Sequence, residues 1–339
     1  MKRELQKSFP KYKSRQVRLA IPSKGRMESE TQEFLRSCGF NIQRNNRQYI
    51  GSIESPIRLQ LVYQRQVDII RGVLNGSLEM GIVGYDLVRE YLPEYDNELI
   101  VIHDALNFGK CSLEIAIPEE WPENSIDEIK QNREVIRVAT KFPKLTKQFL
   151  NSFDITYEII EGNGSLEVYP ELGYSDIIVD LVSTGQTLKD NRLKRINGGQ
   201  IMTSESVLIG NRTSLKNDAI LTVARGLIEY IEATLRAQKF VSVFVNMRGE
   251  SREEIAKEIF SKEGLEGLQG PTISAVFTKN REKMFAVHVI VERKNLQQAI
   301  RNLREIGGSG VVVAPALYIF EEEPLRSIKL LKNLGMDND

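Results

Sequence analysis

Residues 177–188 read Ile-Ile-Val-Asp-Leu-Val-Ser-Thr-Gly-Gln-Thr-Leu, an apolar, β-branched run followed by a polar loop around a glycine. The run predicts a buried parallel strand ending at Asp180, and the loop predicts a helix start. The N–H groups at the helix start and three hydroxyls are hydrogen-bond donors, and the turn that Gly185 allows makes them a concave set suited to a phosphate. An exposed helix N-terminus alone contributes only about 0.3–1 kcal/mol, so these donors must converge to hold a phosphorylated substrate. The hydroxyls belong to Ser183, Thr184 and Thr187.

From this stretch alone, an ordinary strand-to-helix turn capped by a serine or threonine is an equally good interpretation. In the functional interpretation, Asp180 faces a ribose hydroxyl or a magnesium ion. The surrounding sequence has to decide between the two.

Composition limits the classes of protein that the chain can represent. At 339 residues with 41% hydrophobic content, the chain is long enough for roughly two domains of ~150 residues with real cores. Its 46 basic and 46 acidic residues balance, which argues against nucleic-acid or membrane-surface binding through bulk charge. Two cysteines, Cys38 and Cys111, are too few for a disulfide framework and suit a reducing compartment.

The two ends of the chain read as tails. Residues 1–15 are basic and polar without an apolar core, so they predict a flexible tail rather than a secretory signal, and no apolar run is long enough to span a bilayer. We therefore expect a cytoplasmic protein. Residues 321–339 are charged and predict a second tail outside the core.

A first α/β lobe is predicted from residues 16–105 together with about 203–225. The strand at 17–21 is followed by Pro-Ser-Lys-Gly-Arg at 22–26, which puts Lys24 and Arg26 at the sheet edge where α/β proteins bind ligands. A surface turn with two solvated cations is the plain alternative. Gly84, at the end of the strand 80–84, either lets the backbone approach a ligand or only makes a turn. Alternating strands and helices predict parallel pairing.

Residues 106–202 predict a second α/β lobe, which carries the loop 183–187. Its other strands are expected at 113–117, 135–139 and 155–160. Glu167 follows a Gly-Asn-Gly-Ser turn and either orients a sugar hydroxyl or a metal or caps a short helix. Because the chain crosses between the lobes twice, a cleft between them is the default site for a small molecule.

Residues 238–320 follow the order βαββαβ, which predicts a ferredoxin-like domain with no catalytic signature. Its two glycine-rich turns, 264–270 and 307–310, fit either plain loops or parts of an effector pocket. The two histidines, His103 and His288, lie outside every candidate loop and are expected to be structural.

Five motifs now coincide, and together they closely resemble ATP phosphoribosyltransferase, the first enzyme of histidine biosynthesis. The resemblance runs from about residue 17 to 320 and implies two α/β lobes of the type II periplasmic-binding-protein kind around a cleft. The ferredoxin-like domain makes the chain look like the long form, which needs no separate histidyl-tRNA-synthetase-like subunit. The motifs are residues 180–188, 22–26, 81–84, 164–167 and 140–143.

The resemblance implies transfer of phosphoribosyl from 5-phosphoribosyl 1-diphosphate to N1 of ATP, with Mg²⁺ held through the substrate phosphates. Such a reaction requires a grip on both phosphate groups and exclusion of water, and no covalent nucleophile. The catalytic pair would be Lys24 and Arg26, facing the departing diphosphate. The donor-binding residues would be Ser183, Thr184, Gly185, Gln186 and Thr187 for the 5-phosphate, with Asp180 and Glu167 on the ribose hydroxyls and as candidate metal ligands. The ATP side of the cleft would be bordered by Gly25, Arg65 and Gly84.

The resemblance also implies feedback inhibition by L-histidine in the last domain and a homo-hexamer that exchanges with a dimer. The matching effector positions are Asn246, Gly270, Pro271, Thr272 and Ser309. Two positions depart from the family pattern: Ile70 replaces a proline and Glu79 replaces an aspartate, which leaves the role of Glu79 in doubt.

Two other classes remain open from the residues. The two-lobed frame also resembles type II solute-binding proteins, which bind ligands without releasing diphosphate. The acid followed by Ser-Thr-Gly-x-Thr also resembles the donor loop of type I phosphoribosyltransferases, although those usually have two adjacent acids where this chain has Val179 and Asp180.

Overall fold

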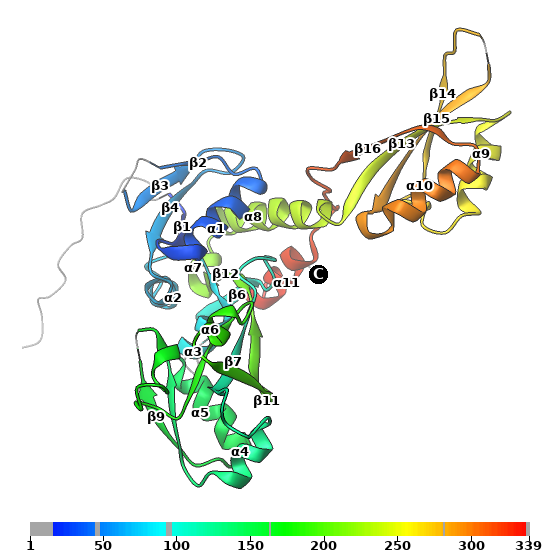
Figure 1. Ribbon diagram of the computed structural model, residues 1–339. Helices are drawn as coiled ribbons and strands as arrows, with labels where there is room; N and C mark the ends of the chain where they lie inside the picture. Colours follow the sequence, from blue (N-terminus) through cyan, green and yellow to red (C-terminus); the bar gives the residue numbers. More distant parts are fainter. Residues whose placement is uncertain (1–15, 45–47, 93–96, 163, 281, 337–339) are drawn as a thin grey trace, which may run out of the picture. The chain divides into compact units, whose positions relative to one another are not determined.

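The computed structural model describes residues 16–44, 48–92, 97–162, 164–280 and 282–336, so the tail expected at 1–15 lies outside the described residues. The described chain forms two compact units. One unit holds the residues up to Gly226 and those from Lys329, and the other is Leu227–Ile328. The first unit contains a seven-stranded and a five-stranded sheet, and the second contains a four-stranded sheet (Figure 1).

The seven-stranded sheet has the order β2-β3-β4-β1-β5-β12-β6. Parallel pairing is confirmed for β1 with β4 and β5. The prediction of parallel pairing is wrong for β3 with β4, because a short connection between two strands permits only an antiparallel hairpin. It is also wrong for β12, which comes from the other sheet and pairs antiparallel with β5. The strands are β1 (Arg18–Pro22), β2 (Ile42–Gln43), β3 (Ile50–Ile53), β4 (Leu59–Gln64), β5 (Met80–Gly84), β6 (Leu99–His103) and β12 (Ser206–Asn211); the helices are α1 (Gly25–Ser37), α2 (Gln66–Leu74), α3 (Tyr85–Tyr91), α7 (Arg212–Leu215) and α8 (Asp218–Ala237).

The five-stranded sheet has the order β11-β7-β10-β8-β9. β10 is parallel to β8, as predicted, but antiparallel to β7. The sequence does not predict β11, because Asn-Gly-Gly at 197–199 interrupts its alternation; the strand passes through these residues with shifts of register. The elements are β7 (Cys111–Pro118), α4 (Ile126–Asn132), β8 (Ile136–Thr140), α5 (Pro143–Ser152), β9 (Tyr157–Glu161), η1 (Leu166–Val168), β10 (Ile177–Val182), α6 (Gln186–Asp190) and β11 (Leu193–Ser204).

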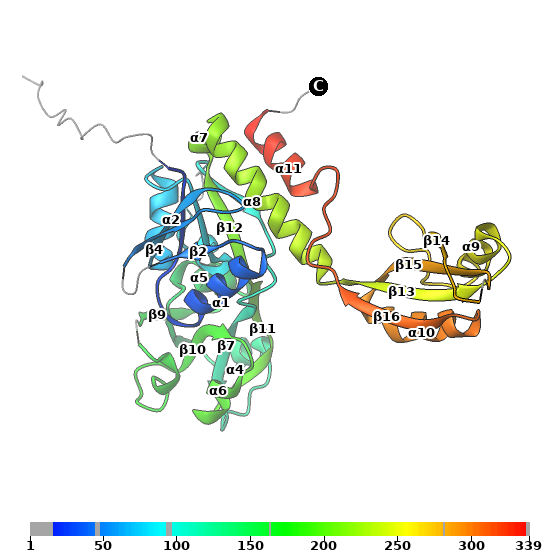
Figure 2. The same cartoon turned by 90° about the horizontal axis from the view of Figure 1, so that it is seen from above.

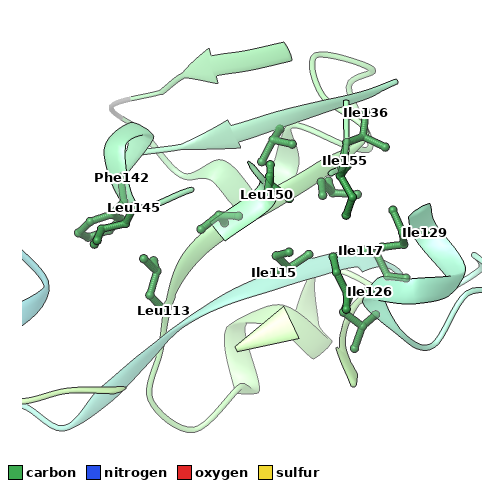
Figure 3. Close-up of a cluster of buried hydrophobic side chains, with 14 residues drawn as sticks. Leu113, Ile115, Ile117, Ile126, Ile129, Ile136, Phe142, Leu145, Leu150 and Ile155 are labelled. Atoms are coloured by element: carbon green, nitrogen blue, oxygen red, sulfur yellow. The ribbon is translucent and has the colours of Figure 1, made fainter. Parts of the chain in front are cut away.

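The two faces of this sheet are covered differently. Alternate residues of β7 and β10 point toward α4 and α5 and form an isoleucine-rich core (Figure 3). The opposite face packs a smaller cluster against η1 and α6, including Leu166 and Leu188. The polar loop after β10 therefore lies on the thinly covered face. In both sheets an antiparallel strand, β12 or β7, lies beside the parallel set, which confirms the expected two-lobed α/β class.

The unit Leu227–Ile328 has the sheet order β14-β15-β13-β16, with all neighbours antiparallel. This order and the succession of elements confirm the ferredoxin-like prediction. Helix α9 begins after Ser251, whose Oγ accepts a hydrogen bond of 3.1 Å from the Glu254 amide. The strands and the helices α9 and α10 are labelled in Figure 2. The elements of this unit are β13 (Phe240–Arg248), α9 (Arg252–Phe260), β14 (Thr272–Val276), β15 (Met284–Glu292), η2 (Arg293–Asn295), α10 (Leu296–Glu305) and β16 (Ser309–Pro315).

The charged tail expected at 321–339 is wrong for much of its length. Leu325–Leu334 form helix α11, in which Leu330 and Leu334 are 2% and 5% exposed. The leucines four residues apart share one helix face, and the charged residues between them stay outside, so net charge concealed an amphipathic helix. The Arg212 guanidinium also donates a hydrogen bond to the Asn333 carbonyl. Within the described residues, no helix is both long and apolar enough to cross a membrane.

We expect Leu330→Ala to destabilise the protein by about 2–5 kcal/mol, because it removes a buried leucine side chain. The matched control is Leu325→Ala on the same helix, where the leucine is 74% exposed. Urea denaturation followed by circular dichroism measures both variants. Small and equal losses in the free energy of unfolding of the two variants would contradict the packing of α11 and support a tail.

Candidate functional site

The segment Ser183–Thr187 runs from the end of β10 into the first turn of the short helix α6 and is called the phosphate loop below, after its predicted ligand. Gly185 has φ of +79°, a left-handed conformation that glycine adopts without strain, and precedes the first helical residue. The Gln186 amide donates to Thr184 Oγ1 at 3.4 Å. Ser183, Thr184, Gln186 and Thr187 are exposed, so the loop is open to solvent.

Asp180 does not end its strand, as the sequence suggested. Pairing with β7 continues through Val182, so Asp180 lies two residues inside β10, directly opposite Glu114. Its side chain is only 16% exposed, and the Leu181 amide donates to its Oδ1 at 2.8 Å. The acid therefore lies on the sheet beside the loop rather than within it.

Burial raises the pKa of Asp180, while Lys141 opposes the rise and the nearby Glu167 carboxylate adds to it. Lys141 Nζ lies 3.5 Å from Asp180 Oδ2. The two acids predicted for the ribose are thus close enough to interact. Lys141 belongs to a recognised motif, but no role was predicted for it, because nothing in the sequence shows that it would reach an acid 39 residues away.

Arg195 is a second cation that the sequence did not indicate. It comes from β11, and its Nε lies 3.3 Å from Glu114 Oε2. A β-carbon added to Gly185 would lie 2.5 Å from Arg195 Nη2, so the guanidinium lies against the turning residue of the phosphate loop. No sequence signal could find this contact, because Glu114 is 81 residues from Arg195 and sits in an otherwise apolar strand.

Lys24 lies between β1 and α1 at the seven-stranded sheet, and Gly25 and Arg26 are the first residues of α1. All three residues are exposed, and Arg26 Nε lies 2.5 Å from Glu30 Oε1. Burial raises the pKa of Cys111 to about 11, and Arg26 is near enough to oppose the rise. Arg26 is therefore near Cys111, the first residue of β7.

Arg65 and Gly84 are linked through Gln66, the residue that follows Arg65. Arg65 is exposed and directly precedes α2, and the next residue, Gln66, accepts a hydrogen bond of 2.7 Å from the Gly84 amide through its side chain. A β-carbon on Gly84 would lie 2.5 Å from Asp86 Oδ1, so this position has no room for a side chain.

Asp86 is a buried acid at the crossings between the two sheets. It accepts a hydrogen bond of 2.6 Å from Ser204 Oγ, which in turn accepts one of 2.9 Å from the Asp86 amide. Burial raises the pKa of Asp86, with Ser204 opposing the rise. Ser204 and Cys111 also line a cavity of about 470 Å³. The sequence showed Asp86 only as an acid beyond a glycine, without its partner 118 residues away.

The predicted effector residues fall into two groups on the four-stranded sheet. Gly270 and Thr272 line a cavity of about 690 Å³ together with His288 and Arg236. His288 stacks on Phe244 with 4.4 Å between ring centroids, and its Nε2 lies 2.5 Å from Ser242 Oγ. Asn246 and Ser309 instead pair across β13 and β16, with Ser309 Oγ donating to the Asn246 carbonyl at 3.2 Å. They are not among the residues that line this cavity, and Pro271 lies between two that are.

Family models cover most of the chain. The model described as HisG, ATP phosphoribosyltransferase, matches residues 65–236, and that of the HisG C-terminal domain matches residues 237–316. The chain belongs to the ATP phosphoribosyltransferase family. The enzyme class is therefore that of a pentosyltransferase, and the pathway is histidine biosynthesis.

Relatives extend this match over nearly the full length. ATP phosphoribosyltransferase 1, chloroplastic, of Arabidopsis thaliana is 38% identical over 336 residues, covering 95% of this chain and 82% of the relative. ATP phosphoribosyltransferase of Methanococcus maripaludis strain C6 is 31% identical over 299 residues, covering 88% and 98%. A solved ATP phosphoribosyl transferase (HisG:HisZ) complex from Thermotoga maritima shares the fold over 64% of this chain and 96% of its own, with a TM-score of 0.51 and 24% identity.

The raised pKa of Asp86 gives a pH prediction. The carboxyl loses its proton near its ordinary value of 3.8 in the unfolded chain but at a higher pH in the folded one. The stability that the protonated form contributes is therefore present below that value and is lost as the pH rises through the folded pKa. We expect Asp86→Asn, which cannot ionise, to gain stability relative to wild type between about pH 4 and about pH 7.

Urea denaturation of both proteins at the two pH values measures this gain. A difference in free energy of unfolding that does not change with pH would contradict the prediction. Asp190→Asn is the control, because Asp190 is exposed.

Proposed function

We propose that the phosphate loop holds the 5-phosphate of 5-phosphoribosyl 1-diphosphate and thereby presents the sugar to ATP. The observation that carries this proposal is the gathering of an open, glycine-turned loop, two interacting acids and two cations at one edge of the five-stranded sheet. In the reaction, N1 of ATP forms a bond to the anomeric carbon while the bond from that carbon to the diphosphate oxygen breaks, and the diphosphate leaves with the bonding electrons.

Asp180 and Glu167 are the proposed partners of the ribose hydroxyls. A carboxylate held partly buried next to another acid accepts hydrogen bonds strongly, and sugar hydroxyls are suitable donors. Lys141, 3.5 Å from Asp180, opposes the rise that burial causes in the pKa of this acid. The sugar ring would then be fixed between the acids and the loop.

Mg²⁺ suits the same two carboxylates. It binds through one or two carboxylates together with substrate phosphates. Burial is the main cause of the raised pKa of Asp180 and the Glu167 charge adds to it, so a cation beside the two acids would favour their ionised forms. When bound, the ion would neutralise phosphate charge.

Lys24 and Arg26 are proposed to neutralise the departing diphosphate, and Gly25, Arg65 and Gly84 to border the ATP. Both cations are exposed on the loop after β1, within reach of a ligand. These roles would put the sugar and 5-phosphate of the donor at the five-stranded sheet, and its diphosphate and the ATP at the seven-stranded sheet.

We expect Thr187→Ala to raise the KM for the phosphoribosyl donor about tenfold, because a hydrogen bond to a charged phosphate is worth about 1.5–3 kcal/mol.

We expect Arg26→Ala to lower kcat by roughly 10²–10³, because its charge is needed when the diphosphate departs. Product formation followed spectroscopically with ATP, donor and Mg²⁺ measures both.

The matched controls are Thr156→Ala and Arg36→Ala, both exposed and distant in sequence from the loops that they control for. A donor KM that is unchanged in Thr187→Ala would remove the loop from the donor site. An unchanged kcat in Arg26→Ala would remove that arginine from the mechanism.

We further propose that L-histidine inhibits the enzyme by binding in the unit Leu227–Ile328, at the cavity that contains Gly270 and Thr272. Arg236 could neutralise the carboxylate of an amino acid, and the acidic run at 321–323 on the same cavity could accept its amino group. The matching C-terminal domain supports a long form. We propose that this form needs no separate subunit and assembles as a hexamer that exchanges with a dimer. A cytoplasmic location stays a prediction.

Histidine should therefore lower product formation by wild type, and Thr272→Val should weaken that inhibition while leaving the uninhibited rate unchanged. Dose–response curves with histidine for both proteins, with Thr278→Val as the control, measure the effect. Identical curves for Thr272→Val and wild type would place the effector elsewhere.

A further inference from the structure

Arg195 and Glu114 form an ion pair beside the phosphate loop that the loop's own motif does not contain. Glu114 is buried on β7, with its side chain 7% exposed, whereas the Arg195 side chain is 44% exposed. The acid is thus fixed within the sheet, and the guanidinium reaches the surface. Ser112 Oγ also donates a hydrogen bond to Glu114 and lies 3.4 Å from the Val182 carbonyl, at the point where β10 enters the loop.

The contacts of the guanidinium differ from one nitrogen to the next. Nη1 donates a hydrogen bond of 3.4 Å to Glu114 Oε1, and Nε lies 3.3 Å from Oε2. Nη2 is the nitrogen nearest Gly185, 2.5 Å from the position that a β-carbon there would occupy, and Nε lies 3.3 Å from the same position. Nη1 therefore fixes the group to the acid, and Nη2 lies at the loop that turns around Gly185.

This arrangement gives two reasons why residue 185 has to be glycine. Its φ of +79° disfavours other residues, and a side chain would also displace the guanidinium from the loop. A solvated arginine elsewhere on β11 would place no such demand on the loop. The close packing keeps a fixed positive charge at the loop even before an anion binds.

We propose that Arg195 is a substrate-binding residue that supplies a cation to the donor's 5-phosphate, with Glu114 and Ser112 as positioning residues. This inference rests on the proposed function, in which the 5-phosphate occupies the phosphate loop. Arginine suits this task because its planar fork can keep a carboxylate on one edge and bind a phosphate oxygen on another. It also completes the site chemically, since the loop's amides and hydroxyls are neutral donors, whereas a phosphate monoester carries up to two negative charges.

The test measures binding of ribose 5-phosphate, which carries the 5-phosphate but no diphosphate, by isothermal titration calorimetry. We expect Arg195→Ala to raise its Kd roughly 10- to 100-fold, as loss of a charged hydrogen bond predicts, and Arg195→Lys to restore part of the affinity. The Kd values of ATP and of inorganic diphosphate should stay within about twofold of wild type. Lys189→Ala is the control, because Lys189 is an exposed cation at the far end of α6.

Glu114→Gln tests the positioning role separately. It should weaken ribose 5-phosphate binding less than Arg195→Ala does, and it should have no additional effect in the Arg195→Ala background, because both changes act through the same guanidinium. Arg195→Gln, which keeps most of the side-chain volume, serves if the alanine variant does not fold.

The outcomes separate this inference from the proposed function. Wild-type affinity for ribose 5-phosphate in Arg195→Ala, alongside lost affinity in Thr187→Ala, would overturn the role of Arg195 and leave the loop as the phosphate site. Unchanged affinity in both variants would overturn the loop as well. Equal losses for ribose 5-phosphate, ATP and diphosphate would show that Arg195 is only structural.

Discussion

Asp180 and Glu114 occupy directly opposite positions on the neighbouring strands β10 and β7, and like charges in such a pair oppose each other. Both side chains are largely shielded from water, so each needs a compensating cation. Lys141 supplies one from the turn after β8, and Arg195 supplies the other from β11. From β11 to the turn after β8, the charges across the sheet therefore run cation, acid, acid, cation, and the phosphate loop begins three residues after Asp180.

This row supports the proposed role of the loop as an anion site over that of a plain turn. Neutral amides and hydroxyls bind an anion weakly in water, whereas fixed cations beside them raise the local potential before the ligand arrives. The acids that hold those cations in place are themselves suited to sugar hydroxyls and Mg²⁺. In the proposed function, the same arrangement holds the charges and binds the substrate, and Asp180 takes part in both.

The two sheets of the first unit are tied by polar contacts at the points where the chain crosses between them. Asp86 and Ser204 exchange hydrogen bonds at one crossing. Glu90, at the end of α3, accepts hydrogen bonds of 2.8 and 3.0 Å from the Lys144 and Leu145 amides at the start of α5. An acid at a helix N-terminus satisfies amides that have no partner within the helix. The loop after β1 and the loop after β10 are thereby held on one scaffold.

The sequence by itself determined the elements whose signal is local. Periodicity placed α8 and the βαββαβ unit, and the motif at 180–188, together with four others, carried the resemblance to the family. It could not show that β10 continues past Asp180, because that depends on pairing with β7, nor that the leucines of α11 would be buried. Only the tertiary structure brought Lys141, Glu114 and Arg195 to the loop, since ion pairs between residues 39 and 81 positions apart leave no periodic trace in a sequence. Local backbone preference and hydrophobic pattern act between near neighbours, whereas charge compensation acts through space and becomes visible only when the strands are in register.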